Sequence, residues 1–133
     1  MTVMVRLDPF ADSLATIKNA EMVGKKVVYL HPASKLLRAV LKILKEYGYI
    51  EDFEYIENFR GGIFKVTLKG RIHNIGAIKP RFSVKWREIE EWERKYLPAY
   101  TMGLLIISTP QGVLTHEEAK KRRVGGRLIA YVY

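Results

Sequence analysis

The stretch LLIISTPQGVLTHEEAKKRRVGGRLIAYVY, residues 104–133, decides how the end of this chain folds. Apolar runs at 104–108 and 128–133 have the length and residue types of β-strands. The polar sequence at 109–114 follows the first run and predicts a loop. The hydroxyl pair Ser108 and Thr109 lies at the end of the first strand, and the glycine pair Gly125 and Gly126 lies before the second. These residues fit two interpretations: ordinary turns, or a surface that binds a ligand.

A short helix is predicted between these two strands. Thr115 and Glu118 have the spacing of a capping box, in which a hydroxyl and a carboxylate satisfy free backbone amides reciprocally. Gly125 and Gly126 come after one or two helical turns, so we expect them to end the helix.

Length and composition favour a small globular protein. The 133 residues are 48% hydrophobic, enough for the core of one domain or of two small packed lobes. The chain has no cysteine, which excludes a disulfide framework and cysteine-based chemistry. No window reaches the roughly 18 apolar residues of a membrane span, and the N-terminus lacks a signal-peptide pattern. We expect an untargeted soluble protein of the cytoplasm, with no membrane partner.

The charge distribution predicts a polyanionic partner. Lys and Arg number 23 against 14 Asp and Glu, a net charge of +9. Residues 1–66 carry +2 and residues 67–133 carry +7. The segment 69–87 contains no acid and six basic residues: Lys69, Arg71, Lys79, Arg81, Lys85 and Arg87. Such an excess is typical of phosphate contacts, although a solvated basic face explains it as well.

The first half predicts the order α-β-α-β-β. Asp8 as N-cap and Pro9 at the first position signal a helix, and a short buried strand follows at 26–30. One face of that helix carries apolar residues: Phe10, Leu14 and Ile17.

A second helix begins near Ser34 and ends at Gly48. Its apolar stripe, which we assign to the core, contains Leu36, Leu37, Val40, Leu41, Leu44 and Tyr47. Strand-like runs at 49–57 and 63–69 flank the turn sequence NFRGG and predict a hairpin.

The second half is organised differently. Gly76 and Pro80 interrupt the segment 71–85, which suggests a crossover between lobes, with a strand at its end, 82–85. A short helix carrying Ile89, Trp92 and Tyr96 follows and is ended by Pro98. The predicted fold class is α+β: an N-terminal α/β lobe, residues 1–72, packs against a C-terminal, mostly β lobe with short helices, residues 73–133.

Catalytic patterns are not found. His31, His73 and His116 have no spacing that places two on one helix face, which disfavours zinc, and each is read as a surface or loop imidazole. Ser108 and Thr109 lie outside any nucleophile elbow, and His116 has no obvious acidic partner. Phosphate-binding glycine loops are absent, and the carboxylates at 51–57 are read as an exposed acidic edge. We therefore predict no enzyme, cofactor, metal or small-molecule substrate.

The sequence Ser-Thr-x-x-Gly at a strand end suits RNA. The shallow minor groove of an A-form duplex displays 2′-hydroxyls and base edges, which short hydroxyl and amide side chains can bond while Lys and Arg take the phosphates. A polar turn followed by a helix end explains the same residues without a ligand. On residue chemistry alone the two readings stay open.

Four segments carry a resemblance to a known family: DPFADSLATIKNA, SKLLRAVLKILKEYGYIEDFE, GRIHNIGAIKPRFSVK and ISTPQGVLTHEEAKKRRVGGRLIAYVY. Together they resemble the family of small-subunit ribosomal protein eight nearly end to end. The pieces IKPRFSVK and EIEEWERKYLPAY are similar to its archaeal and eukaryotic branch. The resemblance implies two α/β lobes without catalysis. It also implies a primary RNA-binding protein that sits on a helical stem in the central domain of small-subunit ribosomal RNA and helps neighbouring ribosomal proteins assemble.

The family's Ser-Thr-Ser-x-Gly loop corresponds to 108–112 and its glycine pair to 125–126. Pro110 replaces the second serine and removes a hydroxyl and a backbone donor. Arg127 stands where bacterial members often carry Glu, so the contact there is expected to involve a phosphate or base edge. The predicted RNA-binding residues are Ser108, Thr109, Gln111, Gly112, Thr115, Gly125, Gly126, Arg127, Lys79, Arg81, Lys120, Lys18, Ser34 and Lys35.

Two other functions stay open at this point. A free RNA-binding translational regulator would use the same basic surface. A small enzyme acting on nucleic acid would need a metal or nucleophile that the sequence does not reveal.

Overall fold

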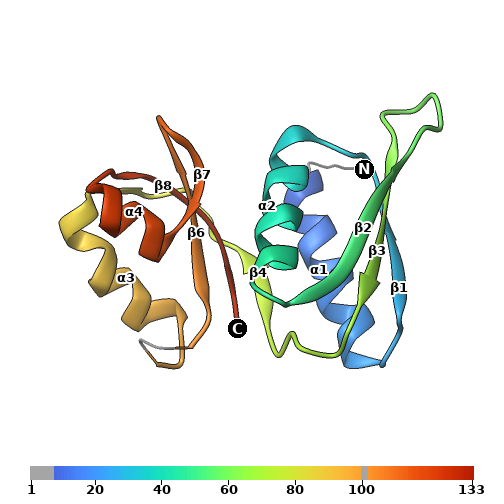
Figure 1. Ribbon diagram of the computed structural model, residues 1–133, viewed down its shortest axis with the longest axis horizontal. Helices are drawn as coiled ribbons and strands as arrows, with labels where there is room; N and C mark the ends of the chain where they lie inside the picture. The colour runs from blue at the N-terminus through green and yellow to red at the C-terminus, as the bar shows by residue number, and fades with distance from the viewer. Residues whose placement is uncertain (1–7, 100–101) are drawn as a thin grey trace, which may run out of the picture.

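The protein consists of two lobes that pack side by side (Figure 1), and the computed structural model describes residues 8–99 and 102–133. Residues 1–7 of the predicted first domain and Tyr100 of the family-like segment lie outside the described residues. The N-terminal lobe has the predicted order of elements: α1 (Pro9–Met22), β1 (Val27–Leu30), α2 (Lys35–Glu46), β2 (Ile50–Ile56) and β3 (Ile63–Leu68).

The C-terminal lobe contains five strands, two α-helices and one 3₁₀ turn within the described residues. In chain order these are β4 (Ile75–Ala77), β5 (Ser83–Val84), η1 (Trp86–Glu88), α3 (Ile89–Tyr96), β6 (Leu104–Thr109), β7 (Gly112–Thr115), α4 (His116–Arg122) and β8 (Gly126–Val132). All pairings are antiparallel: the first sheet has the order β1-β3-β2, and the second has β4-β8-β6-β7 with β5 also on β8. The predicted α+β class is confirmed.

The predicted caps of the two N-terminal helices form. An Asp8 carboxylate oxygen accepts from the Ala11 amide at 3.2 Å, and the Ser34 hydroxyl accepts from the Leu37 amide at 3.1 Å. Gly48, with φ of 80°, follows α2 at its left-handed end, where a side chain would be strained. These local signals fix where α1 and α2 begin and where α2 ends.

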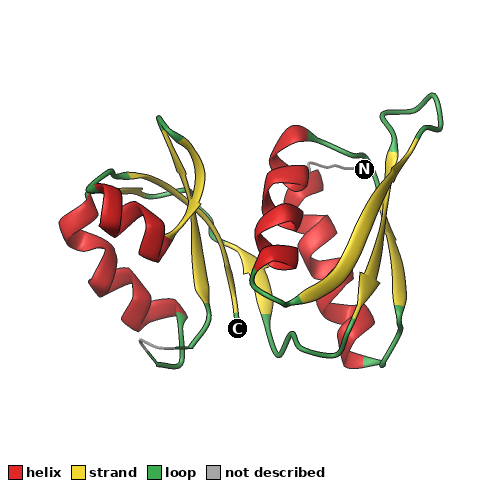
Figure 2. Cartoon of the chain, in the orientation of Figure 1, coloured by secondary structure: helices red, strands yellow, loops and turns green. Residues whose placement is uncertain are grey.

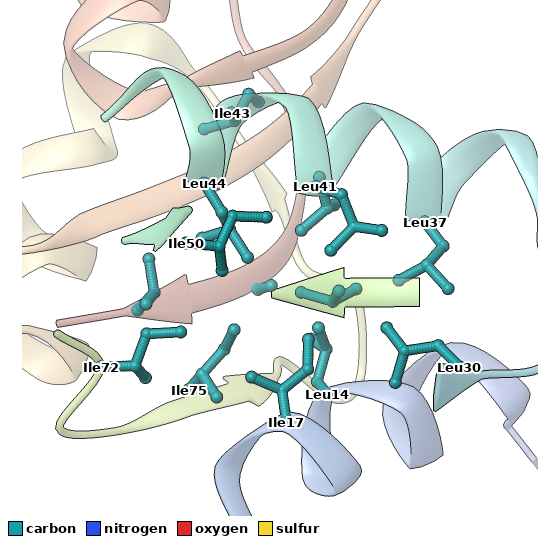
Figure 3. Close-up of a cluster of buried hydrophobic side chains, with 14 of the residues drawn as sticks. Leu14, Ile17, Leu30, Leu37, Leu41, Ile43, Leu44, Ile50, Ile72 and Ile75 are labelled. Atoms are coloured by element: carbon teal, nitrogen blue, oxygen red, sulfur yellow. The ribbon is translucent and has the colours of Figure 1, made fainter. Parts of the chain in front are cut away.

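Layers alternate across the molecule: α3 and α4, the C-terminal sheet, α1 and α2, then the N-terminal sheet (Figure 2). In β6, Leu104 and Ile106 join the core of the N-terminal lobe, while Leu105 and Ile107 face the second cluster with α3 and α4. Figure 3 shows Ile75 of β4 among the side chains of α1 and α2. One apolar cluster therefore spans both lobes, and a second cluster lies within the C-terminal lobe. The boundary at residues 72 and 73 stays a prediction.

Three expectations for the C-terminal lobe are wrong. The expected loop at 109–114 is a hairpin turn, because residues from Gly112 onward pair with β6 as β7. Arg123, with φ of 55°, ends α4 in the left-handed conformation, and not the glycine pair. The crossover segment contains the strand β4, although Gly76 lies within it.

The predicted capping box of α4 is half formed in the described residues. The Thr115 hydroxyl accepts from the Glu118 amide at 3.2 Å, but the Glu118 carboxylate accepts from the Nε of Arg122 at 3.0 Å. An i,i+4 ion pair has replaced the reciprocal bond.

Candidate nucleic-acid interface

A shallow hollow of about 540 Å³ lies over the ends of β5, β6 and β8. We call it the Ser108 hollow; it is lined by Ser83, Val84, Lys85, Glu88, Ser108, Thr109, Pro110, Gly126 and Arg127. Four of the predicted RNA-binding residues meet here, although they come from strands that are far apart in the sequence. Strand pairing is the cause, because β8 runs between β5 and β6 in the sheet.

Ser108 and Arg127 are cross-strand partners that both line this hollow. Arg127 pairs with Ser108 on one side and with Ser83 of β5 on the other. Arg127 is exposed and Ser108 is half-buried. A hydroxyl and a guanidinium side by side can bond a 2′-hydroxyl or base edge and a phosphate of the same duplex.

The glycine pair sets how closely the strands approach. A Cβ on Gly126 would collide with the carbonyl oxygen of Ser108, and a Cβ on Gly125 would collide with the carbonyl oxygen of Val84. These glycines are therefore required by backbone contact between β8 and its neighbours, rather than by a helix end. Gly126 also lines the Ser108 hollow and adds no side chain to it, while Gly125 lines the neighbouring depression.

Thr109 holds the turn of the β6–β7 hairpin together. Its hydroxyl donates to the Gly112 carbonyl at 2.8 Å and accepts from the Gln111 amide at 3.1 Å. A hydroxyl has two acceptor positions, so one is left for a ligand. The Gln111 amide oxygen accepts from Arg122 at 3.2 Å, which ties the turn to the end of α4. Gln111 and Gly112 are exposed at the hairpin tip.

Thr115 and Lys120 are not part of the Ser108 hollow. Thr115 is 3% exposed, and its hydroxyl caps α4 and lies 3.4 Å from the hydroxyl of Tyr47. Lys120 donates to both carboxylate oxygens of Glu93, at 3.3 and 3.0 Å. Both side chains hold the fold together, which favours a structural role without testing their prediction as RNA contacts.

The reading of His116 as a surface imidazole without an acidic partner is wrong. The side chain is 1% exposed, its Nδ1 accepts from the Leu105 amide at 3.0 Å, and its Nε2 lies 3.2 Å from a Glu93 carboxylate oxygen. Burial is the largest influence and lowers the pKa of His116 below its usual 6.5, although Glu93 opposes it. The neutral ring with its proton on Nε2 therefore links β6 to α3.

A second basic site lies at the start of α1. The ammonium of Lys79 is 3.6 Å from the Asp8 carboxylate, and the Arg81 guanidinium lies 5.7 Å from the centre of the Phe10 ring. Burial is the largest influence on Asp8 and raises its pKa, but the Ala11 amide and the two cations together lower it below its usual value. Lys79 and Arg81 are exposed and present their charges beside the helix.

Lys18, Ser34 and Lys35 are spread over the N-terminal lobe. Lys18 is half-buried on α1, while Ser34 and Lys35 are exposed at the start of α2. Ser34 has an internal role as a cap. The structure gathers none of the three into the Ser108 hollow.

A basic aromatic cluster that the sequence patterns did not predict lies beside this hollow. The guanidinium groups of Arg87 and Arg123 lie 5.1 and 5.7 Å from the ring centre of Trp86. Trp86, Arg87 and Gly125 line a neighbouring depression of about 500 Å³ that shares Lys85 with the Ser108 hollow. The only signal was the acid-free run at 69–87, which contains Lys85 and Arg87 but not Arg123.

Other kinds of site find little support in the described part of the chain. Within residues 8–99 and 102–133 no group of three His, Cys, Asp or Glu side chains could hold a metal ion. The helices there are all too short or too polar to cross a bilayer.

A model of the family described as ribosomal protein S8 matches residues 8–133. The chain belongs to the ribosomal protein S8 family. Membership assigns it a role in the small ribosomal subunit, where it binds ribosomal RNA and other ribosomal proteins in the service of translation. The S8 family is a structural RNA-binding family and not an enzymatic one.

Proposed function

We propose that this protein is a primary RNA-binding protein that clamps a helical stem in the central domain of small-subunit ribosomal RNA. Its binding would fix the stem for the proteins that join later in assembly. The protein acts in the cytoplasm as part of the ribosome, and its sequence motifs favour the archaeal and eukaryotic branch of the family. No cofactor or turnover is involved.

One observation carries the proposal: β8 brings Arg127 beside Ser108 and Ser83 in an open hollow that Gly126 also lines. A bulky polyanion can approach such a hollow closely. The lining includes hydroxyls from β5 and β6, which can bond groups of a shallow minor groove, and the cations Lys85 and Arg127, which can pair with phosphates.

Lys79 and Arg81 at the start of α1 supply a second set of phosphate contacts. They belong to the segment that leads from the N-terminal lobe into β5, the strand that contributes Ser83 and Val84 to the Ser108 hollow. Specificity would come from hydroxyls that sense the shape of a distorted stem, and register from the two basic sites.

The proposal is tested by measuring affinity for two RNAs at a series of salt concentrations. One is an isolated central-domain stem, and the other is an unrelated duplex of equal length. We expect stem affinity at least about 1,000-fold higher, and retained at moderate salt. Equal affinities that fall together as salt rises would mean that the protein binds RNA only non-specifically, through its positive charge.

A translational regulator that binds messenger RNA is the second candidate, because it would use the same hollow. Sedimentation separates the two functions. A ribosomal protein travels with small subunits at a ratio near one copy per subunit, whereas a free regulator stays at the top of the gradient.

A further inference from the structure

The turn between β2 and β3 presents an aromatic ring to solvent. Phe59 is 97% exposed, more than any other large apolar side chain of the described residues. Figure 1 shows this turn projecting beyond the helices of the N-terminal lobe, at the end of the molecule away from the C-terminal lobe. Isolated apolar side chains on surfaces are common, so the ring alone carries no conclusion.

The turn is ordered by hydrogen bonds from its own side chains. Asn58 Oδ1 accepts from the amides of Arg60 and Gly62, at 3.0 and 2.8 Å. The Glu57 carboxylate accepts from the Phe59 amide at 3.2 Å and from the Tyr55 hydroxyl at 3.0 Å.

The β1 side fixes the turn as well. The Nε2 of His31 lies 2.8 Å from the Arg60 carbonyl oxygen. The Phe59 ring is thus held on an ordered backbone, which lowers the entropic cost of ordering the turn when a partner binds.

The backbone at Phe59 is unfavourable for an aromatic residue. Its φ of 61° lies in the left-handed region, where Gly or Asn is preferred. The turn already uses Gly61 and Gly62 in this way, with φ of 93° and 82°. The ring gains no burial from this chain, so packing within the described residues does not explain a Phe at a position suited to Asn.

The charge around the turn is opposite to that of the RNA-facing surface. Residues 50–68 hold four acids and two bases, in a chain whose net charge is +9. Glu51, Asp52 and Glu54 lie on β2, an edge strand, and Glu57 directly follows it; all four side chains are exposed. Three of them pair with lysines of their own lobe at 2.9 to 3.7 Å, in exposed ion pairs that contribute little and can be exchanged.

We propose that the β2–β3 turn docks into another protein of the small subunit, with Phe59 filling an apolar pocket and the acids of β2 facing a basic rim. This inference rests on the proposed function, because it places the partner within the subunit. A stacked RNA base would satisfy the ring but not the acids, which would lie against phosphates and repel them. An apolar anchor ringed by complementary charge is the usual arrangement of a protein interface.

Photochemical cross-linking in assembled small subunits tests the proposal. A benzoylphenylalanine is placed at position 59 in one preparation and at position 110, in the Ser108 hollow, in another. We expect the probe at 59 to cross-link to a single ribosomal protein, and the probe at 110 to cross-link to ribosomal RNA. Cross-linking from 59 to RNA, or none at all, overturns the docking proposal.

The two probes separate the failure of this inference from the failure of the proposed function. A probe at 110 that reaches RNA while the probe at 59 does not reach protein leaves the proposed function standing. A probe at 110 that reaches no RNA contradicts the proposed function itself.

The variant Phe59→Asn supplies an independent readout. It suits the left-handed backbone, so we expect an unchanged or raised melting temperature and stem affinity within about twofold of the original. Incorporation into subunits, in competition with the unaltered chain, is expected to fall at least about fivefold. Equal incorporation would contradict docking through this ring.

Discussion

Gly126 lies so close to Ser108 that a Cβ on the glycine would overlap the carbonyl oxygen of the serine. Gly126→Ala is therefore expected to push β8 away from β6 and to lower the free energy of unfolding by about 1–3 kcal/mol. Stem binding should weaken as well, because Arg127 moves with the strand. Chemical denaturation and stem titration measure the two effects.

Arg127→Ala is the matched control, because it changes an exposed neighbour on the same strand. Its free energy of unfolding should stay within about 0.5 kcal/mol of the original, while stem affinity falls roughly tenfold. An alanine at 126 that is tolerated without loss of stability would contradict the close approach of the strands.

Thr109 combines a structural and a binding role. Thr109→Val removes the bonds to Gly112 and Gln111, so we expect a loss of about 1 kcal/mol in stability and weaker binding of the stem in particular. Thr109→Ser retains the hydroxyl and should be close to the original in both. If valine weakens stem and unrelated duplex equally, Thr109 only shapes the turn.

Lys120 is predicted to act on stability and not on salt dependence. Removing its ammonium in Lys120→Met leaves the buried Glu93 carboxylate with His116 alone, so the free energy of unfolding should fall. We expect a loss of about 1–3 kcal/mol, less than for a fully buried pair, because Lys120 is partly exposed. The salt dependence of RNA binding should keep its slope. In contrast, Lys79→Ala or Arg81→Ala should reduce that slope by about one. A reduced slope in Lys120→Met would mean that Lys120 contacts RNA phosphates as well.

Burial of His116 gives the protein a predicted acid sensitivity. Its pKa is lowered on folding, so the unfolded chain binds the proton more readily. The groups that face the ring are Glu93, Glu117, Lys120 and the Leu105 amide. The contribution of the neutral His116 ring to folding stability is complete above the unfolded pKa of about 6.5. It is lost as pH falls from there toward the lowered pKa of the folded state.

Urea denaturation between pH 7.5 and 5 measures this dependence. The original chain should lose stability as pH falls across this range. His116→Gln should be less stable at pH 7.5, but its free energy of unfolding should depend less on pH. Stability that rises on acidification would contradict a neutral buried ring.

Local signals in the sequence were sufficient for the N-terminal lobe. Asp8 and Ser34 cap their helices, and Gly48 follows α2, because these effects depend on residues within one turn. Strand β4 was missed because it is three residues long and is stabilised by pairing with β8, more than fifty residues away. Such pairing leaves no local trace.

The candidate site was only partly predictable for the same reason. Ser108 and Thr109 were identified from their own stretch, but their meeting with Ser83 and Lys85 depends on β5 pairing with β8. The buried Glu93 had a signal that was overlooked. It lies four residues after Ile89, on the same face of α3 that enters the core.

Recognition through the Ser108 hollow is measured by one quantity, the ratio of stem affinity to unrelated-duplex affinity, in two double variants. Ser108→Ala with Arg127→Ala alters the Ser108 hollow, while Lys18→Ala with Lys35→Ala alters distant basic residues. We expect the first double variant to lower the ratio at least about tenfold, and the second to weaken binding of both RNAs and leave the ratio unchanged. The reverse pattern would contradict recognition through the Ser108 hollow.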